Sequence, residues 1–414
     1  MRRVSRSGPP APAVEGSGQG TYCEGMEQGL RLRDLSVTLG GNVVLEATSF
    51  EVAPGEILAI VGPSGSGKTT LLRAVAGLAP SRGTVEIDGR DVTRLPTAAR
   101  NVAMVFEAGA LASFLDVGDN MGLGLRLQGV PTAQRRDRVA EEARRLRLSQ
   151  VLRRKPASLS AGERGRADIG RALVRSAAAW LLDEPLAHLD HAERLDLRRR
   201  LVQEARRRMV PTLYVTHDPV EALALGDRVA VLREGRLIQV DTPHGLYTRP
   251  VDAFVATFVT AQPVGLLPGR VVRSGGLAGF QVGERTLPLW SGLPAALEPY
   301  VDGDVVLALR PEDVQDAAGV QDPDVAVLHG LVAATEFTGP SVLVAVEIDA
   351  PPPRSPGLEH LVAGTDRARL VVRLSREHPV TLAADLALAV DASRAHVFDP
   401  RTGRALWHPA DRVA

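Results

Sequence analysis

The sequence predicts an α/β domain followed by a smaller all-β domain of barrel type. Up to about residue 262, short wholly apolar segments alternate with Arg/Glu-rich segments, a pattern typical of a layered α/β domain. After that point, short β-rich runs are separated by Gly/Pro turns. Residues 1–28 are rich in Gly, Pro and Ser and lack periodicity, so we expect a disordered extension there. The predicted domains are therefore 29–262 and 263–414.

The composition excludes several classes of protein. The 414 residues include 49 Lys plus Arg and 49 Asp plus Glu, and this balance argues against a nucleic-acid partner. Hydrophobic residues at 44% and charged residues at 24% exclude wholesale disorder. A single cysteine, Cys23, excludes an internal disulfide framework and a multi-cysteine metal site. No apolar run approaches the roughly 18 residues that cross a bilayer, so we expect any membrane role to be peripheral.

Local patterns place the elements of the α/β domain. The wholly apolar run Ile57–Val61 follows Pro54-Gly55 and predicts a buried strand. Gly67–Ala76 has helical spacing and ends before Gly77, a residue suited to the position after a helix. Further buried strands are predicted at Val102–Phe106, Ala179–Leu182 and Thr212–Thr216, and helices at about 130–150 and 191–208.

The β domain is predicted from runs of β-forming residues. A loop is expected at Asp349–Pro356, which contains three consecutive prolines. Strands are predicted at Val305–Leu309, Gly330–Ala334, Ser341–Ile348, Arg369–Leu374 and Leu386–Val390.

Arginines gather on the predicted helices of the first domain. They could form a patch for anionic lipids, but solvated helix faces explain them better. The groups are Arg135, Arg136, Arg144, Arg145, Arg198–Arg200 and Arg206–Arg208.

A phosphate-binding loop is predicted between the strand at Ile57–Val61 and the helix that follows. Its glycines let the backbone fold round phosphate oxygens with N–H groups pointing inward, and the helix N-terminus adds partial positive charge. Lys68 is expected to reach the β- and γ-phosphates and Thr69 to hold Mg²⁺, with Thr70 beside them. The residues that fit G-x-x-x-x-G-K-[ST] are Gly62, Pro63, Ser64, Gly65, Ser66, Gly67, Lys68 and Thr69.

Two acids end the predicted strand at Ala179–Leu182. Asp183 is placed to hold Mg²⁺ through water, and Glu184 to polarise an attacking water as general base. An apolar run that ends in Asp-Glu is common and indicates little by itself. With a phosphate loop in the same chain, a metal site is favoured.

Together with four further motifs, these residues resemble the ATP-binding cassette (ABC) superfamily. Leu159–Arg164 resembles its signature motif, and Leu189-Asp190 the end of its D-loop. His217, in Val215–Asp218, resembles its switch histidine, and Glu107 falls at its Q-loop position. The resemblance narrows to the ATPase subunits of carbohydrate importers of the maltose and multiple-sugar type. The segments that carry it are 119–125, 225–232, 241–243, 246–247, 309–313 and 398–400.

The resemblance implies a fold and a mechanism. The fold would be a P-loop NTPase fold with a helical subdomain at about 108–176, followed by an OB/TOBE-like regulatory domain. The site would bind ATP and Mg²⁺, with Glu107 as a further metal ligand and with His217 and Glu107 joining Glu184 in catalysis. Ser160, Gly162 and Asp190 would complete the nucleotide site.

The same resemblance implies several partners. Because one chain holds one phosphate loop and one signature, it would need a second copy or a related ATPase subunit to complete a site. Two separate membrane permease subunits, at the cytoplasmic face of the cell membrane, would transmit its closure. A solute-binding protein would act indirectly, through these permeases.

Five positions depart from the family pattern. Glu107 replaces the Q-loop glutamine, and a carboxylate there repels the γ-phosphate. Ala161 and Glu163 alter the signature, by a methyl group and a negative charge near an anion. Leu39 stands where an aromatic residue would stack on adenine, and Asp168 where a small apolar residue is usual. We expect Asp168 to face solvent or to pair with a nearby arginine, and the site to hydrolyse ATP slowly.

The leading hypothesis is therefore an ATPase that energises solute import, with carbohydrate as the favoured solute. One alternative is a regulatory or structural subunit that dimerises on ATP with little hydrolysis. Another is an importer of a different solute, such as a polyamine or iron. A cassette ATPase acting on nucleic acid is disfavoured. Near the predicted D-loop, His188 and His191 are interpreted as surface residues rather than metal ligands.

Overall fold

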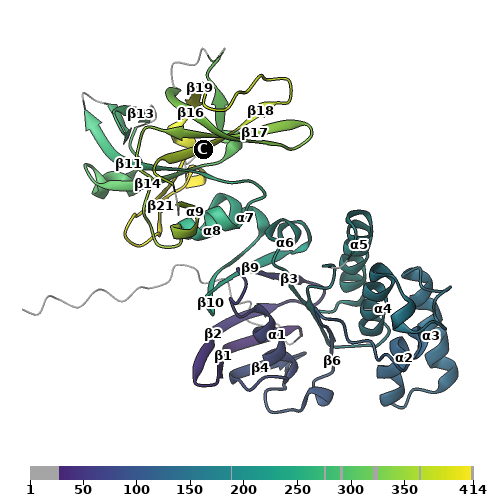
Figure 1. The fold of residues 1–414 in the computed structure, drawn as a ribbon. Helices are drawn as coiled ribbons and strands as arrows, with labels where there is room; N and C mark the ends of the chain where they lie inside the picture. Colours follow the sequence, from purple (N-terminus) through teal and green to yellow (C-terminus); the bar gives the residue numbers. More distant parts are fainter. Residues whose placement is uncertain are drawn as a thin grey trace, which may run out of the picture.

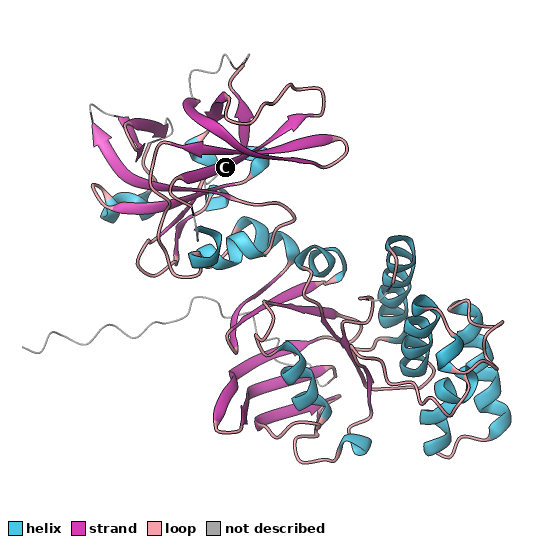
Figure 2. Ribbon diagram, viewed as in Figure 1, coloured by secondary structure: helices cyan, strands magenta, loops and turns pink. Residues whose placement is uncertain are grey.

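The computed structural model describes residues 28–411 except 188, 275–276, 290–291, 319, 321–324 and 363–364. The expected extension at 1–28, apart from residue 28, and His188 lie outside the described residues. An α/β region with two sheets is joined through short helices to a C-terminal region built almost wholly from strands (Figure 2). Within the described part of the chain, no helix is both long and apolar enough to cross a membrane.

The core of the α/β region is a six-stranded sheet of order β10-β9-β3-β8-β7-β6. Its neighbouring strands pair in parallel except β10 with β9, which are antiparallel. The strands β3, β7 and β8 are buried along their whole length, which explains why their sequences are apolar apart from Asp183 at the end of β7 and Thr212 at the start of β8. The bounds are β3 Ile57–Val61, β6 Val102–Val105, β7 Ala179–Asp183, β8 Thr212–Val215, β9 Arg228–Arg233 and β10 Arg236–Asp241.

A second, antiparallel sheet of order β2-β1-β4-β5 covers one side of helix α1, Lys68–Ala76 (Figure 1). Leu71, Leu72 and Val75 of α1 join one apolar cluster with residues of both sheets. The helix ends at Gly77, as predicted, and the φ of 75° at this residue is the left-handed conformation common after a helix. The strands are β1 Leu30–Leu39, β2 Asn42–Val52, β4 Arg82–Ile87 and β5 Arg90–Asp91.

The helices α2 to α5 lie together at one side of the α/β region (Figure 1). Their apolar faces share one cluster with the buried strands β3 and β7. Helix α5 has the predicted bounds, whereas α3 is shorter than the predicted 130–150. The bounds are α2 Val117–Leu127, α3 Thr132–Arg145, α4 Ala161–Leu173, α5 His191–Arg208 and α6 Pro219–Leu225.

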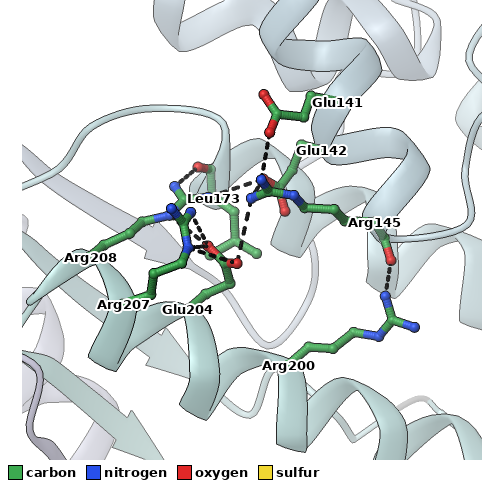
Figure 3. Close-up of polar contacts among 8 residues, drawn as sticks. All are labelled: Glu141, Glu142, Arg145, Leu173, Arg200, Glu204, Arg207 and Arg208. Atoms are coloured by element: carbon green, nitrogen blue, oxygen red, sulfur yellow. Dashed lines mark hydrogen bonds and ion pairs between the residues drawn. The ribbon is translucent and has the colours of Figure 1, made fainter.

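A network of charges joins α3, α4 and α5 (Figure 3). Arg208 donates to Glu142 at 3.1 Å, to Glu204 at 2.8 Å and to the Leu173 carbonyl at 2.5 Å. Arg145 also lies 3.5 Å from Glu204. The side chain of Arg208 is only 21% exposed, so the interpretation of these arginines as solvated helix faces is wrong for it.

The described residues of the C-terminal region form one 11-stranded, antiparallel sheet, and the predicted all-β domain is confirmed. The pairing of the described strands runs as an open path from β15 to β21, with β12 paired to β11 and β13 paired to β12. All five predicted strands are present. The bounds are β11 Gly265–Ser274, β12 Leu277–Val282, β13 Arg285–Leu289, β14 Asp304–Leu309, β15 Val314–Asp316, β16 Ala326–Phe337, β17 Ser341–Ile348, β18 Ala368–Ser375, β19 Asp385–Val390, β20 His396–Phe398, β21 Ala405–Trp407 and the short helix α9 Glu359–Val362.

Helices α7, Pro243–Thr248, and α8, Ala253–Phe258, connect the two regions. Arg310, only 3% exposed, donates to the Tyr247 carbonyl at 2.6 Å, and its guanidinium lies 3.5 Å from the Tyr247 ring centroid. Residues of α8 share an apolar cluster with β11, β14 and β20. The C-terminal region is therefore anchored on α7 and α8.

Candidate active site

The parallel sheet brings the predicted site residues to one edge. Strands β3, β6, β7 and β8 are parallel, so their carboxyl ends lie side by side. The phosphate loop follows β3, and Glu107 follows β6. Glu184 follows β7, and His217 follows β8. Gly62 and His217, which are 155 residues apart in the sequence, thus lie at the same edge of the sheet.

The phosphate loop has the backbone that its glycines were predicted to allow. Gly65 and Gly67 have φ values of 79° and 101°, a region that side chains rarely adopt. A Cβ atom at Gly62 would lie 2.0 Å from the Leu232 carbonyl oxygen, so only glycine fits there. No side chain in the described part of the chain caps the N-terminus of α1, and its first backbone N–H groups are therefore available to an anion.

Two polar side chains of the phosphate loop, Ser66 and Lys68, are buried. Lys68 is 9% exposed and donates to the carbonyls of Gly62 and Pro63, at 2.8 and 2.9 Å. Burial lowers the pKa of Lys68, and the nearby carboxylates of Glu184, Asp183 and Glu107 oppose that shift. The hydroxyl of Ser66 is buried and has no hydrogen-bond partner among the described residues. A bound phosphate would supply this partner.

Thr69 and Asp183 offer oxygen atoms suited to Mg²⁺. The Thr69 hydroxyl donates to Asp183 Oδ1 at 3.1 Å, and Asp183 is 2% exposed. Burial raises the pKa of Asp183, and the charges of Glu107 and Glu184 raise it further. Among the described residues, no group of three or more His, Cys, Asp or Glu is placed to hold a metal ion by itself. These side chains therefore fit a Mg²⁺ ion that takes most of its ligands from phosphate and water. Thr70 follows in the first turn of α1.

Glu184 is held in an unusual backbone conformation. Its φ of 48° is left-handed, and its N–H donates to the Val215 carbonyl at the end of β8. Its Oε1 lies 2.8 Å from His217 Nδ1, with side-chain exposures of 11% and 69%. Such strain persists where the surrounding structure fixes it, and it is common at active sites. The conformation aims the Glu184 carboxylate at His217.

The signature motif begins helix α4 as a capping box. Ser160 is exposed, and its hydroxyl accepts from the Glu163 N–H at 3.1 Å. The Glu163 carboxylate accepts from the Ser160 N–H at 2.8 Å, and this bond lowers the pKa of Glu163. The S-x-x-E spacing predicts such a box, a signal that our sequence analysis missed. Glu163 thus stabilises the helix end while keeping its negative charge.

A contact between α4 and α5 was not predicted either. A Cβ at Gly162 would lie 2.2 Å from Glu193 Oε2, so Glu193 packs directly on the glycine. Glu193 pairs with Arg166, and its N–H donates to the capping carboxylate of Asp190 at 2.8 Å. The structure thus brings Gly162 and Asp190 together around Glu193.

A cleft of about 380 Å³ lies between Glu107, Glu184 and the start of α4. Asp168 lines it and is 4% exposed, so the expectation that Asp168 faces solvent is wrong. The alternative, pairing with arginine, is confirmed, since Arg171 lies 3.8 Å away. Burial raises the pKa of Asp168, and its hydrogen bond with the Ala110 N–H opposes that shift.

The chain matches known proteins over most of its length. A family model described as ABC transporter matches residues 45–187. The sn-glycerol-3-phosphate import ATP-binding protein of Cereibacter sphaeroides is 39% identical over 378 residues, which cover 91% of this chain and 99% of the relative. The chain belongs to the ABC transporter family.

Two further relatives of this ABC protein are import ATP-binding proteins. The trehalose/maltose import ATP-binding protein of Thermococcus litoralis is 36% identical over 92% of this chain and 100% of the relative. The diacetylchitobiose uptake system ATP-binding protein of Streptomyces coelicolor is 36% identical over 87% and 94%. The ABC fold and nucleotide binding predicted from the motifs are confirmed, and the protein is an ABC ATPase.

Proposed function

We propose that this ABC ATPase energises carbohydrate import through separate membrane permease subunits, at the cytoplasmic face of the cell membrane. The observation that carries this proposal is the meeting of Lys68, Asp183, Glu184 and His217 at one sheet edge. The named relatives take up glycerol phosphate, trehalose, maltose and diacetylchitobiose, which are all polyhydroxylated. These names therefore favour a carbohydrate over a polyamine or iron as the solute that is transported.

Each site residue has a proposed role. Lys68 and backbone N–H groups within residues 64–70 hold the phosphates of ATP. Bound Mg²⁺, held by Thr69 and Asp183 with Glu107 close by, would neutralise phosphate charge. Glu184 accepts the proton of the attacking water, and His217 fixes the orientation of its carboxylate through the 2.8 Å contact.

The active unit would be a dimer. Ser160 is exposed and its chain holds one phosphate loop, so the signature of a second subunit would cover the nucleotide. Gly162 and Asp190 would face the same nucleotide from that side. The partner is either a second copy or a related ATPase, and a solute-binding protein would act through the permeases. We assign 29–262, with its helical subdomain at 108–176, to nucleotide binding and 263–414 to regulation.

The departures from the family pattern suggest slow hydrolysis. Glu107 adds a carboxylate near Asp183 in a cleft that must receive the γ-phosphate. This favours a second candidate function, a subunit that dimerises on ATP but barely hydrolyses it.

Sugar uptake by vesicles that hold the permeases and this chain tests the proposal. Uptake should require ATP on the side of the ATPase and should stop with Lys68→Ala. Uptake that is equal with Lys68→Ala, or a strict preference for polyamines, would contradict it. ATP-driven dimerisation without measurable turnover would instead favour the second candidate.

A further inference from the structure

A tight turn presents Glu107 to the cleft. The Gly109 N–H donates to the Phe106 carbonyl at 2.9 Å, which closes a β-turn with Glu107 and Ala108 at its centre. Gly109 has a φ of +71°. We call residues 106–110 the Glu107 turn.

Two side chains of helix α4 form hydrogen bonds with Ala110, at the end of the Glu107 turn. Asp168 Oδ1 accepts from the Ala110 N–H at 3.0 Å. Arg171 donates to the Ala110 carbonyl at 2.7 Å and lies 3.8 Å from the Asp168 carboxylate. Both polar groups of one residue are therefore held by two side chains of α4 that also pair with each other.

The carboxylate of Asp168 also fills the space beside Gly109. A Cβ atom at Gly109 would lie 2.7 Å from Asp168 Oδ2, closer than real Cβ atoms approach. Because Asp168 is 4% exposed, water does not substitute for these contacts. Glycine at 109 and aspartate at 168 are thus a matched pair across the contact.

We propose that Asp168 is a positioning residue, which with Arg171 fixes the Glu107 turn against the helix that carries the signature serine. Ser160 caps the same helix, and Asp168 lies two turns further along it. A rigid helix moves as a unit, so any movement at Ser160 reaches Glu107 through this contact. The contact acts on Glu107 without touching nucleotide. The effect of this contact on turnover rests on the proposed function. The contact between Asp168 and the Glu107 turn does not depend on that function.

Three variants of the full chain test the contact. Asp168→Ala removes the acceptor, Asp168→Asn keeps an acceptor oxygen without the charge, and Gly109→Ala pushes the turn away. The control is Glu142→Ala, because Glu142 is also 4% exposed and paired with arginine, but lies on α3 in the network of Figure 3. Glu142→Ala should cost stability without moving the turn.

Hydrogen–deuterium exchange of a peptide that covers 106–111 is the first readout, and it needs no ATP hydrolysis. Exchange should be faster in Asp168→Ala and Gly109→Ala, close to unchanged in Asp168→Asn, and unchanged in Glu142→Ala. Unchanged exchange in Asp168→Ala overturns the proposal. So does equal acceleration in Glu142→Ala, because the effect would then be general loosening.

Turnover of the chain with its permeases is the second readout. Asp168→Ala should lower kcat about tenfold, with the KM for ATP within about twofold, because a misplaced turn disturbs the reaction more than binding. Asp168→Asn should restore most of kcat. A kcat of Asp168→Ala equal to that of the unaltered chain overturns the proposal. If the unaltered chain itself shows no turnover, the proposed function fails, while the exchange result still decides the contact.

Discussion

The carboxylate of Glu184 lies 2.8 Å from Nδ1 of His217, although 33 residues separate them. The parallel pairing of β7 with β8 brings the two residues together, since each follows the carboxyl end of its strand. Because a carboxylate only accepts hydrogen bonds, this contact places the imidazole proton on Nδ1. Glu184 is thereby oriented before nucleotide arrives.

The first prediction concerns Glu184 as the general base. Glu184→Gln keeps the shape of the side chain but removes the proton acceptor, so turnover should fall at least about 100-fold. ATP should then hold the protein as a dimer, which gel filtration with and without MgATP detects. A chain that barely hydrolyses ATP would show no change in turnover, and that result would favour the regulatory alternative.

The second prediction concerns Glu107. Replacing it by Gln removes a negative charge near Asp183, so kcat should rise several-fold. Glu163→Gln is the companion variant, because glutamine also completes a capping box and should leave the melting temperature nearly unchanged. Steady-state phosphate release by the assembled transporter measures both. If neither variant changes kcat, hydrolysis is not slowed by these charges.

The third prediction concerns the stacking of adenine on the side chain at position 39. Leu39 ends β1 and is 41% exposed, and a Cβ atom at either of the next two residues, Gly40 and Gly41, would have no neighbour within 4 Å. Leu39→Tyr should tighten ATP binding about tenfold, because stacking on a base contributes about 1–3 kcal/mol. Leu39→Ala should change affinity little. Calorimetric titration with MgATP compares them, and equal affinities would place adenine elsewhere.

The fourth prediction concerns the charge network of Figure 3. Arg208→Ala leaves the buried Glu142 with fewer partners, so the free energy of unfolding should fall by about 3 kcal/mol. Arg199→Ala is the matched control, because Arg199 is 69% exposed and should cost less than about 1 kcal/mol. Urea unfolding followed by circular dichroism measures both, and similar losses would argue against a special role for Arg208.

The fifth prediction concerns pH. His396 contacts His408 across 3.0 Å in the C-terminal region, and burial lowers the pKa of His396 from 6.5 to about 3. The unfolded chain therefore binds a proton more readily than the folded one below pH 6.5. Stability should be highest above that pH and should decline as the pH falls toward 3. Melting temperatures of the unaltered chain and His396→Gln, at several pH values, should show a weaker decline in the variant.

The sequence predicted the parts of this protein that local patterns determine. Strands such as Ile57–Val61 are apolar throughout because both faces are buried, and the phosphate loop carries its own glycines. Helix α2 was not predicted, since Gly122 and Gly124 lower its helix propensity.

Contacts between distant residues could not be read in the same way. Asp168 accepts a hydrogen bond from the N–H of Ala110, 58 residues earlier, and nothing near Asp168 in the sequence indicates this partner. The link from Gly162 to Glu193 is of the same kind. Such contacts depend on how helices pack, and only the structure supplies that.

That this chain binds nucleotide through its phosphate loop can be tested by equilibrium binding of MgATP to the purified chain, with Lys68→Ala as the comparison. Binding to the unaltered chain should saturate at or below about millimolar nucleotide and should be strongly weakened in the variant. Equal binding by both proteins, or no binding at that concentration even with the permease chains present, would contradict it.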